Sequence, residues 1–256
     1  MRIVVKVGTS TLTHPTGNTN IRRVQALCRV LSDLKNAGNE IILVSSGAIA
    51  MGAGKLLLTE KPSDMPTKQA AAAIGQCELM YIYDREFSKY NHKIAQLLIT
   101  NSDVQNETNH QNFRNTLSRL LELNVLPVIN ENDTVSTEEI SIGDNDTLGA
   151  IVATSIDADM LILLSDIDGL YNKDPHKNPD AKLIPVVENL SDEIMKMGEG
   201  KGSSFGTGGM HTKLNAAKIA TDDGIDMIIA NGNDPELLYD IVEGKEIGTR
   251  FIGKRG

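Results

Sequence analysis

Short apolar runs of strand length alternate along this chain with longer stretches in which apolar residues recur at helical spacing. The runs are rich in Val, Ile and Leu and lie at residues 3–7, 41–44, 94–99, 125–129, 160–164 and 227–230. Strands that are apolar almost throughout are typical of burial on both faces. The helical stretches cover residues 21–34, 68–90, 112–123, 144–156, 212–223 and 235–242, and the first stops before Gly38.

Strand and helix in repeated succession predict an α/β protein, with a mainly parallel sheet sandwiched between helices in three αβα layers. One segment departs from this rule. Residues 135–142 alternate polar and apolar side chains between two turn-like clusters, which predicts a small β-hairpin. Pro and Gly gather at residues 173–185 and 198–209, but each stretch has the length of a loop rather than a linker. We therefore expect a single domain over residues 1–256, with two lobes.

The charge of the chain narrows the range of partners. Its formal charge is −9, from 25 Lys and Arg against 34 Asp and Glu, which disfavours nucleic acid and anionic lipid as partners. Trp is absent and aromatic residues make up 4% of the chain, so base stacking is a weak hypothesis. The longest apolar runs, of about five residues, are too short to span a membrane. The N-terminus enters a strand without a signal peptide, and we expect a cytoplasmic protein.

The cysteines and histidines predict neither a disulfide framework nor a metal site. Cys28 and Cys77 are too few and too far apart for either, and we expect both to be core thiols. The five histidines are scattered, and no His or Cys cluster has the spacing of metal ligands. No protein-bound metal centre is therefore predicted.

Lys6 and Gly8 mark the end of the first predicted strand. A lysine inside an otherwise apolar strand is costly unless its ammonium reaches an anion or water. Gly8 lets the backbone approach a ligand closely, and ligands of open α/β sheets gather at the carboxyl ends of strands. These observations favour a ligand-binding lysine. The alternative is an edge strand whose lysine reaches solvent.

Two further glycine-rich turns lead from loops into helices. VSSGAIA at residues 44–50 places small residues around Gly47, whose exposed N–H groups would form an anion site, although close helix–sheet packing also needs small residues. GTGGMHTK at residues 206–213 joins a flexible loop to a helix N-terminus that carries Thr212 and Lys213. Such a terminus suits a polyphosphate. Its alternative is an ordinary capping turn in a solvent loop.

Acidic and amide residues cluster on both sides of the predicted hairpin, as INEND at 129–133 and GDND at 143–146. Their carboxylates and amides can receive the α-ammonium of an amino acid, although Asn and Asp are also common turn formers. Another strand-end loop, LSDIDGLY at 164–171, is placed to contact a nucleotide.

These segments, in this order, resemble the amino acid kinase family from Lys6 to about Gly248. The resemblance rests on KVGTS, VSSGAIAMG, HKIAQLLIT, PVINENDTV, IGDNDTLGA, LLSDIDGLYNKDP and GTGGMHTKL. Members that act on carbamate, aspartate, N-acetylglutamate or UMP share the Lys-Gly start but not the pair INEND and GDND. The resemblance therefore implies an αβα sandwich that uses ATP to phosphorylate the γ-carboxylate of L-glutamate, giving glutamyl 5-phosphate, the first step of proline biosynthesis.

The resemblance also implies a role for individual residues. Lys6 and Lys213 would hold the ATP phosphates, and Asp146 would orient the two lysines or the metal. Glutamate would bind in a substrate lobe, roughly residues 1–155, at Ser46, Gly47, Asp133 and Asn145. A nucleotide lobe would cover roughly residues 156–256, and the remaining nucleotide contacts would come from Gly8, Ser165, Asp166, Thr207, Gly208, Gly209, Met210, His211 and Thr212.

The chemistry of such a reaction fits the residues present. The acceptor carboxylate, whose pKa in water is about 4.3, is already ionised at neutral pH, so no general base is needed. Positive charge must offset the repulsion between two anions, so Lys6, Lys213, further N–H groups at Gly8 and Gly47, and Mg²⁺ bridging phosphate oxygens are expected. Two alternatives stay open: a family member with another acceptor, and a non-catalytic sensor of amino acid and nucleotide.

Three further expectations rest on the resemblance. It implies a homo-oligomer and feedback inhibition by proline. Many similar chains continue into a C-terminal PUA domain, and because this sequence ends at Gly256 we expect a form that lacks it.

Overall fold

A mainly parallel sheet runs through the structure, a computed structural model that describes residues 1–135, 145–175, 177–198 and 209–255. Within these ranges the sheet has eight strands in the order β3-β4-β2-β1-β5-β7-β8-β6. All neighbouring strands are parallel except β7 and β8, which are antiparallel. The strands are β1 (Arg2–Val7), β2 (Glu40–Ser45), β3 (Ile94–Ile99), β4 (Leu126–Glu131), β5 (Met160–Ser165), β6 (Val186–Val187), β7 (Asp226–Asn231) and β8 (Thr249–Phe251).

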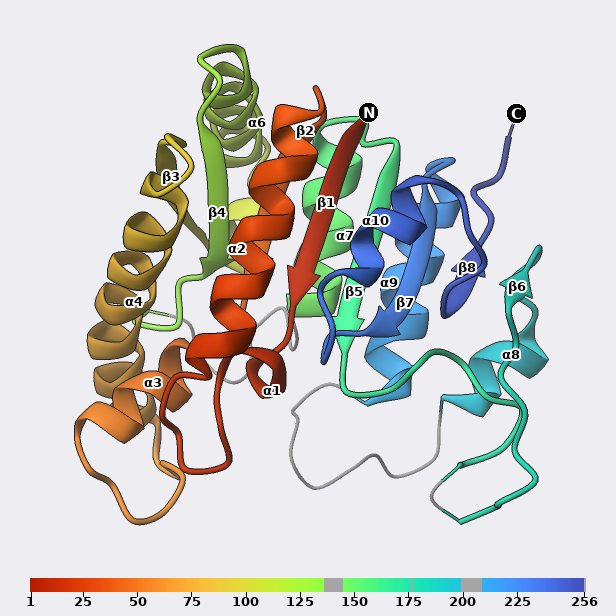
Figure 1. Ribbon diagram of the computed structural model, residues 1–256, viewed down its shortest axis with the longest axis horizontal. Coiled ribbons are helices and arrows are strands. Elements are labelled where there is room, and N and C mark those ends of the chain that lie inside the picture. Colours follow the sequence, from red (N-terminus) through yellow and green to blue (C-terminus); the bar gives the residue numbers. More distant parts are fainter. Residues whose placement is uncertain (136–144, 176, 199–208, 256) are drawn as a thin grey trace.

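Helices cover both faces of this sheet (Figure 1). One apolar core lies between the sheet and α2, α3, α4 and α10, and a second lies between the opposite face and α6, α7 and α9. The predicted α/β class and its three αβα layers are therefore confirmed. In the described ranges the helices are α1 (Thr9–Leu12), α2 (Ile21–Asn36), α3 (Ala48–Lys55), α4 (Met65–Ser88), α5 (Asn101–Gln105), α6 (Glu107–Glu122), α7 (Asn145–Ser155), α8 (Asp192–Met197), α9 (Met210–Asp222) and α10 (Leu237–Val242).

The predicted helices and strands match this architecture, except for its shortest elements. All six predicted strands are present, with ends shifted by at most two residues. The sequence did not predict β6, β8, α1, α5 or α8, which have two to six residues and too few positions for a period to emerge. The predicted hairpin at residues 135–142 falls almost entirely outside the described residues.

The prediction for Cys77 is wrong. Cys28 is buried as expected, but Cys77 is exposed. The buried stripe of α4 runs through Ala72, Gln76 and Leu79, at the spacing of a helix face. Cys77 lies one position past this stripe and so faces away from the core.

Glycines allow α3 and α4 to pack with their backbones in contact. A Cβ atom added at Gly75 would lie 1.7 Å from the carbonyl oxygen of Ala48, and one at Gly52 would lie 1.8 Å from that of Ala71. Close packing, the alternative considered for these small residues, is thus present, but between two helices rather than between helix and sheet. This contact fixes the start of α3 at the end of β2.

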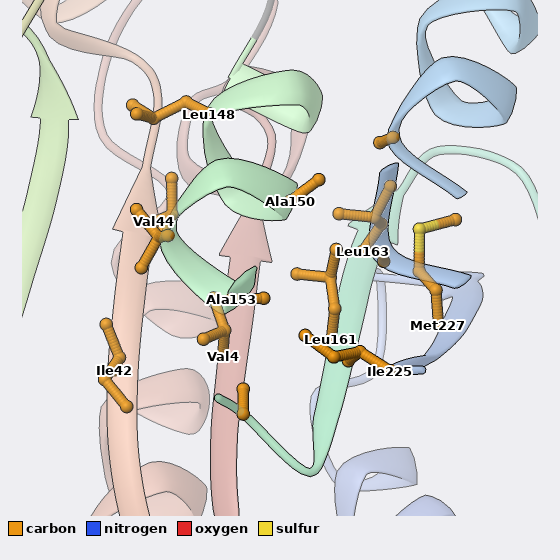
Figure 2. Packing of buried hydrophobic residues seen from close by; sticks show 14 of the residues in the cluster. Val4, Ile42, Val44, Leu148, Ala150, Ala153, Leu161, Leu163, Ile225 and Met227 are labelled. Atoms are coloured by element: carbon orange, nitrogen blue, oxygen red, sulfur yellow. The ribbon is translucent and has the colours of Figure 1, made fainter. Parts of the chain in front are cut away.

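Helix α7 lies across β2, β1 and β5 at close range (Figure 2). Its buried residues Ala150 and Ala153 are small enough for the helix to approach the sheet. A Cβ atom at Gly149 would lie 3.4 Å from Cβ of Lys6, in ordinary van der Waals contact. The first turn of α7 is therefore held over the carboxyl end of β1.

Gly75 and Gly149 allow the close contact between α3 and α4 to be tested. Gly75→Ala forces α3 and α4 apart and should lower the free energy of unfolding by about 1–3 kcal/mol, as measured by urea denaturation. Gly149→Ala is the matched control, because it changes a helical glycine where the methyl group has room. That variant should be stabilised or unchanged, by up to about 1 kcal/mol. Equal effects at both positions would contradict the close α3–α4 contact.

Candidate active site

The carboxyl ends of β4, β2, β1 and β5 meet at one edge of the sheet, because these strands are parallel neighbours. Strand β1 is central, and Lys6 pairs with Val44 of β2 on one side and Leu163 of β5 on the other. Lys6 is therefore not on an edge strand that reaches solvent, which removes the alternative explanation for this residue. The chain leaves β1 towards β2, and β5 begins the other half of the sheet, so this is the point where the strand order reverses and ligands commonly bind.

Three buried charges meet at this point. Nζ of Lys6 lies 2.5 Å from Oδ1 of Asp146, and Nζ of Lys213 lies 3.0 Å from Oδ2 of the same carboxylate. Lys6, Asp146 and Lys213 are only 5%, 1% and 6% exposed. One carboxylate is thus shared by two ammonium groups that are 207 residues apart in the chain. We call these three residues the ion cluster.

Local structure brings the members of the ion cluster together. Asp146 lies in the first turn of α7, where the helix dipole favours a negative charge. Lys213 lies in the first turn of α9, after the N-cap Gly209. Thr212 contributes a hydroxyl that lies 3.2 Å from Oδ2 of Asp146 and 2.8 Å from the carbonyl oxygen of Gly209.

Within the ion cluster, two ammonium groups and one carboxylate carry a formal charge of +1. Charges of this kind are costly inside a protein, where little water screens them. An anion that enters beside Lys6 and Lys213 would offset the excess. The arrangement therefore favours a negatively charged ligand at the ends of β1 and α9.

Polar side chains adjoin the ion cluster on the side of β2 and β4. Nδ2 of Asn145 lies 2.9 Å from each of three oxygens: the carbonyl of Ser45, Oγ of Ser46 and Oδ1 of Asn130. Gly47 follows with a φ of +99°, a conformation that favours glycine. Asn145 and Asp146 are consecutive on α7, so the two groups of polar side chains adjoin each other.

Asp133 lies just beyond the end of β4, and its carboxyl group has an altered acidity. Burial raises the pKa of Asp133 to about 6, with the nearby carboxylate of Glu131 as a second, smaller cause. Glu131 is itself buried. A partly buried carboxyl group near a second one is a natural partner for a cationic group of a ligand.

Among the described residues, the predicted nucleotide contacts lie at the carboxyl ends of β1 and β5 and at the N-terminus of α9. Ser165 ends β5, and its hydroxyl donates to Oδ1 of the exposed Asp166. The N–H of Gly8 donates to the carbonyl of Leu164 at 3.3 Å, so it is paired within the protein rather than available as the expected donor.

The first two residues of α9, Met210 and His211, differ in their exposure to solvent. Met210 is partly buried against the core, whereas His211 is exposed. The remaining two predicted loop residues, Thr207 and Gly208, lie outside the described residues.

Asn130 and Gln76 were not among the predicted site residues. Asn130 stands within INEND, of which only Asp133 was predicted to bind glutamate. Gln76 is a single amide among the buried apolar residues Ala72 and Leu79 of α4, and its Oε1 accepts from Nδ2 of Asn130 at 2.8 Å. That interruption of the apolar face was the available signal.

Two negative findings hold for the described ranges. They contain no group of three or more His, Cys, Asp or Glu side chains that could hold a metal ion. None of their helices is long and apolar enough to cross a membrane.

Comparisons with known proteins give the family. Residues 1–231 match the family model described as the amino acid kinase family. The chain belongs to the amino acid kinase family. It is 52% identical to a glutamate 5-kinase of Clostridium perfringens, over 100% of this chain and 96% of that protein. It is 54% identical to a glutamate 5-kinase of Caldanaerobacter subterraneus subsp. tengcongensis, over 98% of this chain and 68% of that protein.

Solved structures agree with the amino acid kinase fold. An isopentenyl phosphate kinase from T. acidophilum superposes with a TM-score of 0.64 at 19% identity, covering 98% of this chain and 100% of that one. A UMP kinase from Bacillus anthracis superposes with a TM-score of 0.67 at 14% identity, covering 99% and 96%. At these identities the likeness concerns the fold alone.

The unequal charges of the ion cluster predict unequal effects on stability. Asp146→Asn removes the shared carboxylate from two buried ammonium groups and should lower the free energy of unfolding by about 3 kcal/mol. Lys213→Met keeps the ion pair between Lys6 and Asp146 and should cost less, about 1 kcal/mol. Urea denaturation at neutral pH and low salt measures both. An Asp146→Asn variant as stable as Lys213→Met would refute the shared-carboxylate arrangement.

Proposed function

We propose that this chain transfers the γ-phosphoryl group of ATP to the γ-carboxylate of L-glutamate, forming glutamyl 5-phosphate, as the first step of proline biosynthesis. The observation that carries the proposal is the ion cluster, in which Lys6 and Lys213 converge from opposite ends of the chain beside the polar side chains around Asn145. Relatives about half identical over the whole chain and named glutamate 5-kinase support the same acceptor.

In this proposal the two lysines act on the phosphates. An anionic carboxylate must approach an anionic phosphate in line, so catalysis depends on position and on positive charge that faces the transferring group. Lys6 and Lys213 supply that charge from a site with little water, where electrostatic stabilisation is strong. Asp146 holds both ammonium groups in place, so they need not reorganise when the charge shifts.

The residues present fit ATP that carries its own Mg²⁺. Mg²⁺ keeps several waters and binds through one or two carboxylates together with substrate phosphates. Asp146 is the buried carboxylate at hand, and both of its oxygens already contact lysines. We therefore assign Mg²⁺ mainly to the phosphates, where it neutralises charge on their oxygens when bound.

Glutamate is placed on the other side of Asp146. Ser46, Gly47 and Asn145 lie where a substrate next to the ion cluster would meet them, and Asp133 offers a carboxylate to the α-ammonium. The γ-carboxylate would then face Lys6 and Lys213. No proton needs to be removed from it, since a carboxylic acid of this type is ionised at neutral pH.

Removal of either lysine should slow the chemical step. Lys6→Ala and Lys213→Ala are each expected to lower kcat by about 10²-fold or more, the loss typical of one donor to a transition state. Lys218→Ala is the matched control, because Lys218 lies on the same helix as Lys213, is exposed and pairs with Asp222. Turnover close to wild type in Lys6→Ala or Lys213→Ala would remove that lysine from the mechanism.

Asp133 should act on glutamate rather than on ATP. Asp133→Ala is expected to raise KM for glutamate with little change in KM for ATP, since a carboxylate next to phosphates would repel them. Equal increases in both KM values would contradict this assignment.

The raised pKa of Asp133, about 6, predicts a pH dependence. Because the ionised form is the one that binds an ammonium group, kcat/KM for glutamate at saturating ATP and Mg²⁺ should fall as the pH drops below about 6, and Asp133→Asn should lack this inflection. For stability the sign is opposite. A folded-state pKa above the usual 3.8 means that the contribution of Asp133 falls as pH rises from about 4 through 6.

One assay tests the function directly. ADP formation is measured by a coupled assay with glutamate, aspartate and N-acetylglutamate side by side, each with and without proline. The proposal expects turnover with glutamate above the other two. Turnover with another acceptor would assign the chain to a different branch of the family, and binding without ADP formation would make it a sensor. The proline arm tests feedback inhibition, and sedimentation of the same sample tests the proposed homo-oligomer.

A further inference from the structure

Three amide side chains, two of them buried, form a continuous hydrogen-bonded chain from α4 to α7. Oε1 of Gln76 accepts from Nδ2 of Asn130 at 2.8 Å, and Oδ1 of Asn130 accepts from Nδ2 of Asn145 at 2.9 Å. Gln76 and Asn130 are 7% and 2% exposed. Of the three amides, only Asn145 is itself among the residues assigned to glutamate, and it also contacts Ser46. We call this series the amide chain.

Backbone groups fix the direction of every amide in this chain. The N–H of Glu131 donates to Oδ1 of Asn130 at 2.9 Å, so that atom must be the acceptor. Nδ2 of Asn130 must then be the donor, which requires Gln76 to present its oxygen. At the other end the carbonyl of Ser45 requires Asn145 to present Nδ2. The amide chain therefore has a single self-consistent orientation.

This orientation determines what Asn145 offers to a ligand. Because its Nδ2 is directed at Ser45, Ser46 and Asn130, its Oδ1 points the other way. Within the described residues no hydrogen bond to this Oδ1 is present. A carbonyl oxygen accepts from an ammonium group and rejects a carboxylate. Asn145 is thus set to recognise a cation.

Gln76 occupies its place at a cost. Its Nε2 is buried, and among the described residues it finds no hydrogen-bond partner. A leucine or methionine would fill this position on the apolar face of α4 without leaving a donor unpaired. The amide thus serves a purpose other than stability, and the contact that distinguishes it from an apolar side chain is the one from Oε1 to Asn130.

We propose that Gln76 is a positioning residue for substrate recognition: through Asn130 it holds Asn145 in the orientation that selects the α-ammonium of the acceptor. The inference rests on the proposed function. Without the Gln76 oxygen, Asn130 still accepts from the N–H of Glu131 at its Oδ1 but loses the partner of its Nδ2, so its side chain is held at one end only. Asn145 still donates to Ser45 and Ser46, but its third acceptor, Oδ1 of Asn130, is less firmly placed, and the preference of Asn145 for an ammonium group weakens.

The test compares L-glutamate with glutarate, which has the same two carboxylates but no α-amino group. In Gln76→Met, kcat/KM for glutamate should fall by about tenfold, through KM, because a hydrogen bond to a charged group is weakened. The value for glutarate should stay within about twofold of wild type. Gln76→Glu keeps an oxygen that accepts from Asn130, so its preference for glutamate over glutarate should stay within about threefold of wild type.

A control separates recognition from general loosening of α4. Ile82→Val removes one buried methyl group from the same helix without contacting the amide chain, and it should leave the preference unchanged. The inference is overturned if folded Gln76→Met affects both substrates equally or neither. It is overturned as well if Gln76→Glu loses the preference, and this variant decides the matter should Gln76→Met not fold.

Assays of the wild-type protein distinguish a failure of the proposed function from a failure of the role assigned to Gln76. If it turns over neither glutamate nor glutarate, the proposed function fails. If it turns over both with equal kcat/KM, the function stands and the role assigned to Gln76 fails.

Discussion

The structure of the site depends on one buried carboxylate shared between two ammonium groups. Asp146 holds Lys6, from the first strand, and Lys213, from a helix near the end of the chain, at opposite oxygens. Without it, two like charges with little access to water would repel each other. With it, they are held close together and still carry an excess positive charge. A site of this kind is stable enough to preform and remains attractive to an anion.

The fold supplies this arrangement through a single helix start. The small residues of α7 bring its first turn over the end of β1, and two consecutive side chains there have different partners. Asp146 faces the lysines, whereas Asn145 faces Ser46 and the amide chain. Two ligands bound on either side of this turn would therefore lie next to each other. The shared turn is a physical reason why a phosphate donor and its acceptor would meet here.

The sequence was sufficient for the architecture because its strands are apolar almost throughout and because helices such as α2 and α6 have a clear apolar stripe. It also indicated Lys6, since a charge in an apolar strand requires a partner. Residue patterns alone did not indicate that partner, which came only from the family resemblance, because the contact between Lys6 and Asp146 spans 140 positions and exists only once α7 packs on the sheet. Gly52 and Cys77 show the same limit. Whether a small residue faces a ligand or a neighbouring helix is decided by packing, which no local pattern records.

The most direct measurement is a crystal structure with a non-hydrolysable ATP analogue and Mg²⁺, in which the distances from both Nζ atoms to the phosphate oxygens are read. We expect Lys6 and Lys213 each within about 3 Å of a phosphate oxygen of the same nucleotide, with Asp146 still contacting both. A nucleotide bound with either ammonium group directed at bulk solvent, or with the two lysines separated from each other and from Asp146, would contradict the account.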